Sequence, residues 1–178
     1  ALEIKDNLVI IDRGNITAKH IVVATHYPIL NIPGYYFMRM HQEMSYVIAL
    51  ENAQDVNGMY IDVQKNGCSF RNYKDLLLLG AIDQRSGENE KGGCYDKLRK
   101  IAKDLYPNAK EKYHWSAQDC MTIDNIPYIG EYSDETENIY VATGFNKWGM
   151  TLSMVAAHLL KDMICGKKRE GSDIFSPS

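Results

Sequence analysis

The residues whose types and spacing most clearly suggest a binding site lie between Gly144 and Thr151, where two glycines and an Asn interrupt an apolar pattern. The run before them, 139–143, is β-branched and aromatic, which predicts a buried strand. Apolar residues at helical spacing from Met150 predict a helix that ends near Gly166. The first N–H groups of such a helix are unpaired and lie at its positive end, so they suit an anion or an electron-rich carbonyl. An ordinary strand-to-helix turn has the same pattern.

The composition bounds the class of protein. The 178 residues carry 20 Lys and Arg against 23 Asp and Glu, a net charge of −3, which leaves no basic field for nucleic acid or an anionic membrane. An apolar run such as Leu76–Leu79 is far too short to span a bilayer, and the first residues lack the pattern of a signal peptide. We therefore expect a cytoplasmic protein whose partner is a small-molecule substrate.

The cysteines and histidines do not form metal-binding patterns. The four cysteines, Cys68, Cys94, Cys120 and Cys165, are widely spaced, and the five histidines form no close pair. This spacing predicts reduced, mostly buried thiols and no metal site.

The elements that must position the glycine turn begin near the N-terminus. Two runs, 7–12 and 20–24, read as strands, and Arg13-Gly14-Asn15 between them predicts a hairpin. The second run is almost continuously apolar, which predicts a central strand covered on both faces.

The middle of the chain has a different character. Strand-like runs with turn signals at Asn57-Gly58 and Asn66-Gly67 predict an antiparallel sheet, and they lie at 44–50, 59–63, 69–73 and 76–82. A helix is predicted over 95–105 and another strand over 111–117, while the polar tail from Lys167 is expected to fray. This order of elements predicts one domain inserted into another: a buried strand pair comes first, then an antiparallel block, and then a second buried strand with its helix.

Four short matches in the right order point to a family. The chain resembles the FAD-dependent amine and amino-acid oxidoreductases related to D-amino acid oxidase, glycine oxidase and sarcosine oxidase. The matching segments are 16–25, 113–119, 124–130 and 142–151. Within the family, 115–119 and the tail 174–178 are similar to the subgroup fused to a Rieske iron–sulfur domain.

The resemblance implies an α+β fold with two domains. An antiparallel-sheet substrate domain, 34–112, would be inserted into the remnant of an FAD-binding α/β domain made of 1–33 and 113–166, followed by the tail 167–178. The family's N-terminal βαβ unit carries G-x-G-x-x-G for the FAD pyrophosphate, and these 178 residues contain no such motif. We therefore expect a C-terminal portion of such a protein.

The resemblance also implies FAD as the cofactor and a set of residues around it. Ala24 and Thr25 would lie near the cofactor, and the loop beneath the isoalloxazine ring would comprise Gly144, Phe145, Asn146, Lys147, Trp148, Gly149, Met150 and Thr151. The N–H groups of 149–151 would stabilise the negative charge of a reduced flavin. Lys147 is either an added charge or a solvated surface residue, and Trp148 either walls the flavin or fills a core gap.

The substrate side is less defined. Amino-acid-oxidising members have an Arg shortly before the turn at Asp124, and Asp119 occupies that place here. Arg71 or Arg39 could supply a cation from elsewhere, although an ordinary surface arginine is the alternative interpretation of each. Cys120 does not align with the flavin-linked cysteine of sarcosine oxidases, so we interpret it as a buried structural thiol. The pocket candidates are Tyr46, Tyr60 and Gln118, which ordinary packing also explains, and no catalytic residue is assigned.

Two hypotheses follow for the function. In the first, the chain is a fragment of an FAD-dependent oxidoreductase that oxidises a C–N bond of an amine or amino-acid-like substrate, and it is inactive alone. In the second, it is a non-catalytic module that binds a small molecule or a protein. A truncated flavin domain would also expose an apolar face and self-associate through it.

Overall fold

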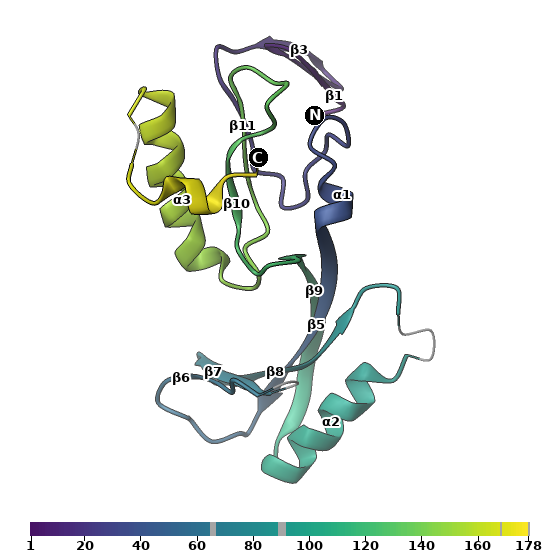
Figure 1. Ribbon diagram of the computed structural model, residues 1–178. Coiled ribbons are helices and arrows are strands. Elements are labelled where there is room, and N and C mark those ends of the chain that lie inside the picture. The colour runs from purple at the N-terminus through teal and green to yellow at the C-terminus, as the bar shows by residue number, and fades with distance from the viewer. Residues whose placement is uncertain (65–66, 89–91, 168, 178) are drawn as a thin grey trace. The chain divides into compact units, whose positions relative to one another are not determined.

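The computed structural model describes residues 1–64, 67–88, 92–167 and 169–177 (Figure 1). The chain divides into two compact units: unit 1 comprises 1–41 and 119–178, and unit 2 comprises 42–118. Among the described residues, no helix is both long and apolar enough to cross a membrane. Each unit has its own core, so each is described separately.

Unit 1 contains two three-stranded sheets. The first is an antiparallel meander of β1 (Glu3–Lys5), β2 (Leu8–Ile11) and β3 (Gly14–Thr17). The second has the order β10–β11–β4, with β4 (Ile21–Val23), β10 (Tyr128–Glu131) and β11 (Ile139–Thr143). β11 pairs antiparallel with β10 and parallel with β4, so a strand from the start of the chain and one from near its end share one sheet.

All five residues of β11 are buried, which places this strand at the centre of unit 1. Leu159 and Leu160 of α3 (Gly149–Ile164) pack against Ile129 and Tyr140 on one side. Ile21 and Val141 belong to a second cluster, against which the meander residues Ile4 and Val9 pack. The remaining elements of unit 1 are the short helix α1 (Tyr36–Arg39) and the 3₁₀ helix η1 (Ser172–Phe175).

Unit 2 is built on one five-stranded sheet with the order β6–β7–β8–β5–β9. Its strands are β5 (Met40–Glu51), β6 (Met59–Ile61), β7 (Ser69–Tyr73), β8 (Leu76–Arg85) and β9 (Lys110–Thr122). Helix α2 (Cys94–Leu105) covers one face, where Leu98 packs on Leu77, Leu79 and Ile48. The antiparallel sheet and the helix after it were both predicted from the hydrophobic pattern, and the α+β class is confirmed.

The structure corrects the prediction at the N-terminus. The runs 7–12 and 20–24 do not form a hairpin, because β3 lies between them and takes β2 as its partner. β4 is also not a central strand covered on both faces. It is the last strand in the order of its sheet, and its residue Val22 is 44% exposed.

The tail and the thiols also differ from expectation. The tail is not frayed throughout, because Ser172 is buried and Asp162 of α3 binds the guanidinium of Arg169 at 2.6 Å. Cys94 and Cys120 are buried as predicted, whereas Cys165 is exposed. The unit boundaries fall at 41/42 and 118/119, compared with 33/34 and 112/113 from sequence, and the turn signal at Asn66-Gly67 lies partly outside the described residues.

Candidate functional site

The two predicted cofactor stretches meet at one edge of the sheet in unit 1. Because β4 and β11 run parallel, with Val23 opposite Val141, the residues that follow them leave the sheet side by side. These residues are Ala24 and Thr25 after β4, and Gly144 after β11. Ligands of parallel sheets characteristically bind beyond the carboxyl ends of the strands.

A hydrogen bond holds the two strand ends together. The hydroxyl of Thr143, the last residue of β11, donates to the backbone carbonyl of His26 in the loop after β4. In that loop, the hydroxyl of Thr25 donates to the carbonyl of Tyr27 at 2.7 Å. Ala24 and Thr25 are exposed, so this edge is accessible within unit 1.

Gly144 is required by both conformation and space. Its φ of +70° lies in the left-handed region, which costs a residue with a Cβ about 1–2 kcal/mol. A Cβ at this position would lie 2.3 Å from Cγ2 of Thr122 and 3.4 Å from Sδ of Met40. Thr122 is itself buried, so the clash has no easy relief. The loop can therefore leave β11 in this direction only with glycine here.

Asn146 fixes the loop to the end of β9. Its Oδ1 accepts from the backbone N–H of Thr122 at 2.9 Å, while its Nδ2 donates to the Gly144 carbonyl at 2.8 Å. Its own N–H donates to the Cys120 carbonyl at 3.2 Å. Sequence reasoning treated Asn146 only as a turn residue and a cofactor neighbour, and it missed this positioning role. Asn146 has a left-handed φ of 48°, a backbone conformation that Asn adopts more readily than most residues.

The N-terminus of α3 has no side-chain cap. Trp148 stands at the capping position, where its backbone carbonyl accepts from the N–H groups of Thr151 and Leu152 at 3.1 and 2.9 Å. Within the described part of the chain, the N–H groups of Gly149 and Met150 have no acceptor. A Cβ built on Gly149 would meet only Cδ2 of Phe145, at 3.8 Å. The helix start is therefore an open pair of donors beside a glycine.

Apolar side chains flank these donors. Trp148 is 60% exposed and Met150 is 92% exposed, so the alternative in which Trp148 fills a core gap is wrong. Lys147 is exposed and has a left-handed φ of 69°. Two free N–H groups at a positive helix end, with an exposed indole beside them, fit the electron-rich edge and flat face of a flavin ring.

The predicted substrate residues lie in unit 2 and do not form a cluster. The Tyr46 hydroxyl accepts from Nε2 of Gln84 at 2.9 Å, and its ring packs edge-on against Tyr95 at 5.0 Å. Burial, followed by the neighbouring Cys94 thiol, raises the pKa of the Tyr46 hydroxyl. Tyr60 is exposed on β6, and Gln118 donates to the Ser86 hydroxyl at 2.9 Å. Ordinary packing accounts for these contacts.

Asp119, which stands where the family resemblance places an Arg, and the two arginines considered as substitutes for it do not share one location. Asp119 is a half-buried residue of β9 with its own negative charge. The guanidinium of Arg39 donates to the carbonyl of Pro177 and so holds the tail. Arg71 remains exposed on β7.

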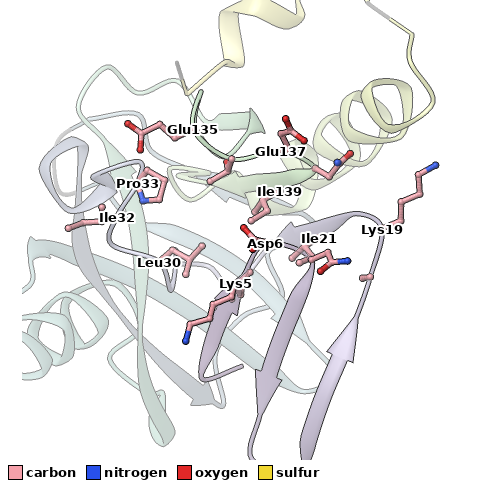
Figure 2. A pocket seen from close by; sticks show the side chains of 15 residues that line it. Lys5, Asp6, Lys19, Ile21, Leu30, Ile32, Pro33, Glu135, Glu137 and Ile139 are labelled. Atoms are coloured by element: carbon pink, nitrogen blue, oxygen red, sulfur yellow. The ribbon is translucent and has the colours of Figure 1, made fainter.

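A cavity of about 780 Å³ in unit 1 was not anticipated from the sequence (Figure 2). It lies at the amino ends of β4 and β11, where Ile21 and Ile139 contribute to its lining, and so at the opposite end of these strands from Gly144. Asp6, Glu135 and Glu137 line it together with Lys5 and Lys19, and this mixture of charges defines no single ligand chemistry. In the part of the chain that the structure describes, no group of three His, Cys, Asp or Glu side chains is placed to hold a metal ion.

An uncapped helix start at the carboxyl ends of parallel strands, in a chain with an inserted antiparallel sheet, is an arrangement typical of cofactor-binding domains with a separate second unit. The chain belongs to the DAO family, described as FAD dependent oxidoreductase, which it matches over residues 1–163. FAD is therefore the cofactor of its family, and the predicted resemblance is confirmed.

Individual relatives support the same assignment. The chain is 36% identical over 172 residues to YhfW of Bacillus subtilis (strain 168), a protein named for a Rieske 2Fe-2S iron-sulfur centre, covering 93% of this chain and 34% of that protein. Glycine oxidase from Geobacillus kaustophilus has the same fold with a TM-score of 0.76 at 22% identity, over 94% of this chain and 47% of that one. L-amino acid deaminase from Proteus vulgaris gives a TM-score of 0.74 at 16% identity, over 99% and 56%. The chain thus spans about a third of the curated relative and about half of these solved structures.

Proposed function

We propose that this chain holds the ring end of FAD and carries the substrate-binding sheet of an oxidoreductase that oxidises a C–N bond of an amine or amino-acid-like substrate. The observation that carries the proposal is the meeting of Thr25, Gly144 and the free N–H groups of α3 at one sheet edge. Glycine oxidase and L-amino acid deaminase are named for amino-acid substrates, which supports the same substrate class for this member of the family.

The chain's own residues bind and orient in this proposal. When bound, FAD supplies the chemistry by accepting a hydride from the substrate. The N–H groups of Gly149 and Met150 donate to the electron-rich edge of the ring, and Trp148 shields one side of it. Gly144 and Asn146 keep the loop in place. No residue of the chain is assigned as an acid or a base.

We further propose that these 178 residues bind FAD weakly and turn over no substrate by themselves. G-x-G-x-x-G does not occur in them, so they lack the pyrophosphate-binding loop that provides much of the contact with a dinucleotide. The helix start at Gly149 would then bind the ring without the adenylate half.

A flavin titration of matched variants tests the proposal. The purified chain is titrated with FAD, and binding is followed by flavin absorbance and fluorescence before and after desalting. Gly149→Leu places a side chain over the free donors where the structure shows open space, so the fold should remain intact while FAD affinity falls at least about tenfold. Ala157→Leu adds a similar side chain to an exposed position of α3 and should leave FAD affinity unchanged. Equal affinities of the two variants would contradict the assigned position of the ring.

The second candidate function is a non-catalytic binding module. The exposed apolar residues of β6, Met59, Tyr60 and Ile61, favour it, because such a strand is a surface that a partner can cover. A chain that shows no FAD-dependent change in absorbance, yet is folded by circular dichroism, would support this function over the first.

Self-association through unit 1 is a separate proposal. Among the described strands, β4 pairs along one edge only and exposes Val22, so its second edge and this side chain offer hydrogen-bonding groups and apolar area to a second copy. Sedimentation velocity over a range of concentrations should show oligomers that Val22→Lys reduces and Val63→Lys, an exposed residue of unit 2, does not. A monomer at all concentrations would disprove it.

A further inference from the structure

One row of side chains crosses the face of the unit 2 sheet that α2 does not cover. Phe70 of β7 packs into the core beneath α2, so its neighbour Arg71 lies on the opposite face. The strand register places Met59 of β6 directly opposite Arg71 on one side and Leu78 of β8 opposite it on the other. Across the next pair, Leu78 faces Ala49 of β5.

Exposure falls steadily along this row. Met59 is 78% exposed, Leu78 is half-buried and Ala49 is 1% exposed. Arg71 therefore stands where the apolar surface changes from open to buried, between two apolar neighbours that can pack along its aliphatic stem. Its guanidinium is the charged group of this row.

Arg71 differs from the other arginines in its contacts. Among the described residues it has neither an ion pair nor a side-chain hydrogen bond. The other five each have an acceptor, in the pairs Arg13–Asp12, Arg39–Pro177, Arg85–Glu88, Arg99–Glu111 and Arg169–Asp162. Within the described part of the chain, the fold thus leaves the Arg71 guanidinium on an apolar sheet face without an acceptor for its donors.

We infer that Arg71 binds the carboxylate of an amino-acid-like ligand, whose apolar part lies against Met59 and Leu78. A guanidinium presents a planar pair of N–H donors that matches a carboxylate. The identity of the ligand rests on the proposed function, whereas the binding surface belongs to unit 2 alone.

The test is carried out on the whole chain without flavin. Benzoate, a carboxylate with an apolar body, is titrated into the ¹⁵N-labelled protein, and benzamide serves as its uncharged counterpart. Saturable amide shifts are expected over residues 59–61, 69–73 and 76–80 with benzoate and not with benzamide. Arg71→Gln should weaken benzoate binding at least about tenfold. Arg71→Lys, which keeps the charge without the planar fork, should fall between Arg71→Gln and the unaltered chain.

Arg85→Gln is the matched control, because Arg85 is also an exposed arginine of the same sheet but is paired with Glu88. Its benzoate affinity should equal that of the unaltered chain. The inference is overturned if benzoate does not bind, if benzamide binds equally well, if the shifts lie elsewhere, or if Arg71→Gln binds as well as Arg85→Gln. If the unaltered chain binds benzoate but does not bind FAD in the titration described above, the result counts against the proposed function and not against the role of Arg71.

Discussion

Replacing Gly144 with Ala probes the loop on which the proposed cofactor site depends. The φ of +70° costs an L-residue about 1–2 kcal/mol. The added Cβ would lie 2.3 Å from Cγ2 of the buried Thr122, and overpacking of this kind costs about 1–3 kcal/mol. The two contributions together predict a loss of about 2–5 kcal/mol in the free energy of unfolding of unit 1.

A second glycine separates the two contributions. Gly166 also has a φ of +70°, but nothing lies within 4 Å of the Cβ that Ala would add. Gly166→Ala should therefore cost only the conformational part, about 1–2 kcal/mol. Thr122→Ser removes the clashing methyl and keeps the hydroxyl that accepts from Asn146, so it should partly restore a Gly144→Ala chain in a double-mutant cycle.

Urea denaturation with a local probe measures these differences. The chain has two tryptophans, and in a Trp115→Phe background the fluorescence reports on Trp148, which lies in the same unit as Gly144. This avoids the assumption that both units unfold together. Equal losses for Gly144→Ala and Gly166→Ala, or no rescue by Thr122→Ser, would refute the steric part of the argument.

Two further predictions concern unit 1. Asn146→Ala should lower the free energy of unfolding, measured in urea, by about 2–3 kcal/mol, because it removes the hydrogen bonds to Thr122 and Gly144. Asn146→Gly should lower it by about 1 kcal/mol less, because Gly tolerates the φ of 48°. Equal losses for the two variants would contradict this reasoning. Burial raises the pKa of the Tyr132 hydroxyl to about 12, above its unfolded value, so its contribution is complete below pH 10 and is lost as the pH rises towards 12, at about 1.4 kcal/mol per unit. Denaturation at several alkaline pH values should show a shallower decline in Tyr132→Phe, and an unchanged slope would show that Tyr132 does not titrate as described.

Local patterns predicted the elements of the site but not all of their partners. Each element of the site is encoded by residues close together in the sequence. The structure contains the buried run 139–143 as β11, followed by the predicted glycine turn and then by the predicted helix as α3. β3 was missed because Gly14–Thr17 contains a single apolar residue, Ile16, and all four of its residues are exposed, so it shows no apolar alternation. Once β3 pairs with β2, the run at 20–24 must find its partner far along the chain, in β11.

The positioning contacts of the site depend on segments that are distant in sequence. Neither the clash that requires Gly144 nor the bonds of Asn146 can be read from the loop itself, because both involve Thr122 at the end of β9. The assignment of Trp148 was left open for a similar reason, since exposure depends on what packs around a helix start. A sequence pattern predicts that a turn exists, whereas the tertiary contacts decide which of its residues are structural.

The two long strands that lead into and out of unit 2 are neighbours in its sheet. Paired strands lie about 4.8 Å apart, so the chain leaves unit 1 and returns to it at nearly the same point. Unit 2 therefore connects two points of unit 1 that are already close together, and it places little constraint on the domain that receives it. Residues can be inserted, deleted or exchanged within 42–118 without altering the path of β4, β11 or α3. Evolution, or a protein engineer, can therefore change the sheet of unit 2 while leaving unaltered the strands and helix that form the proposed cofactor site.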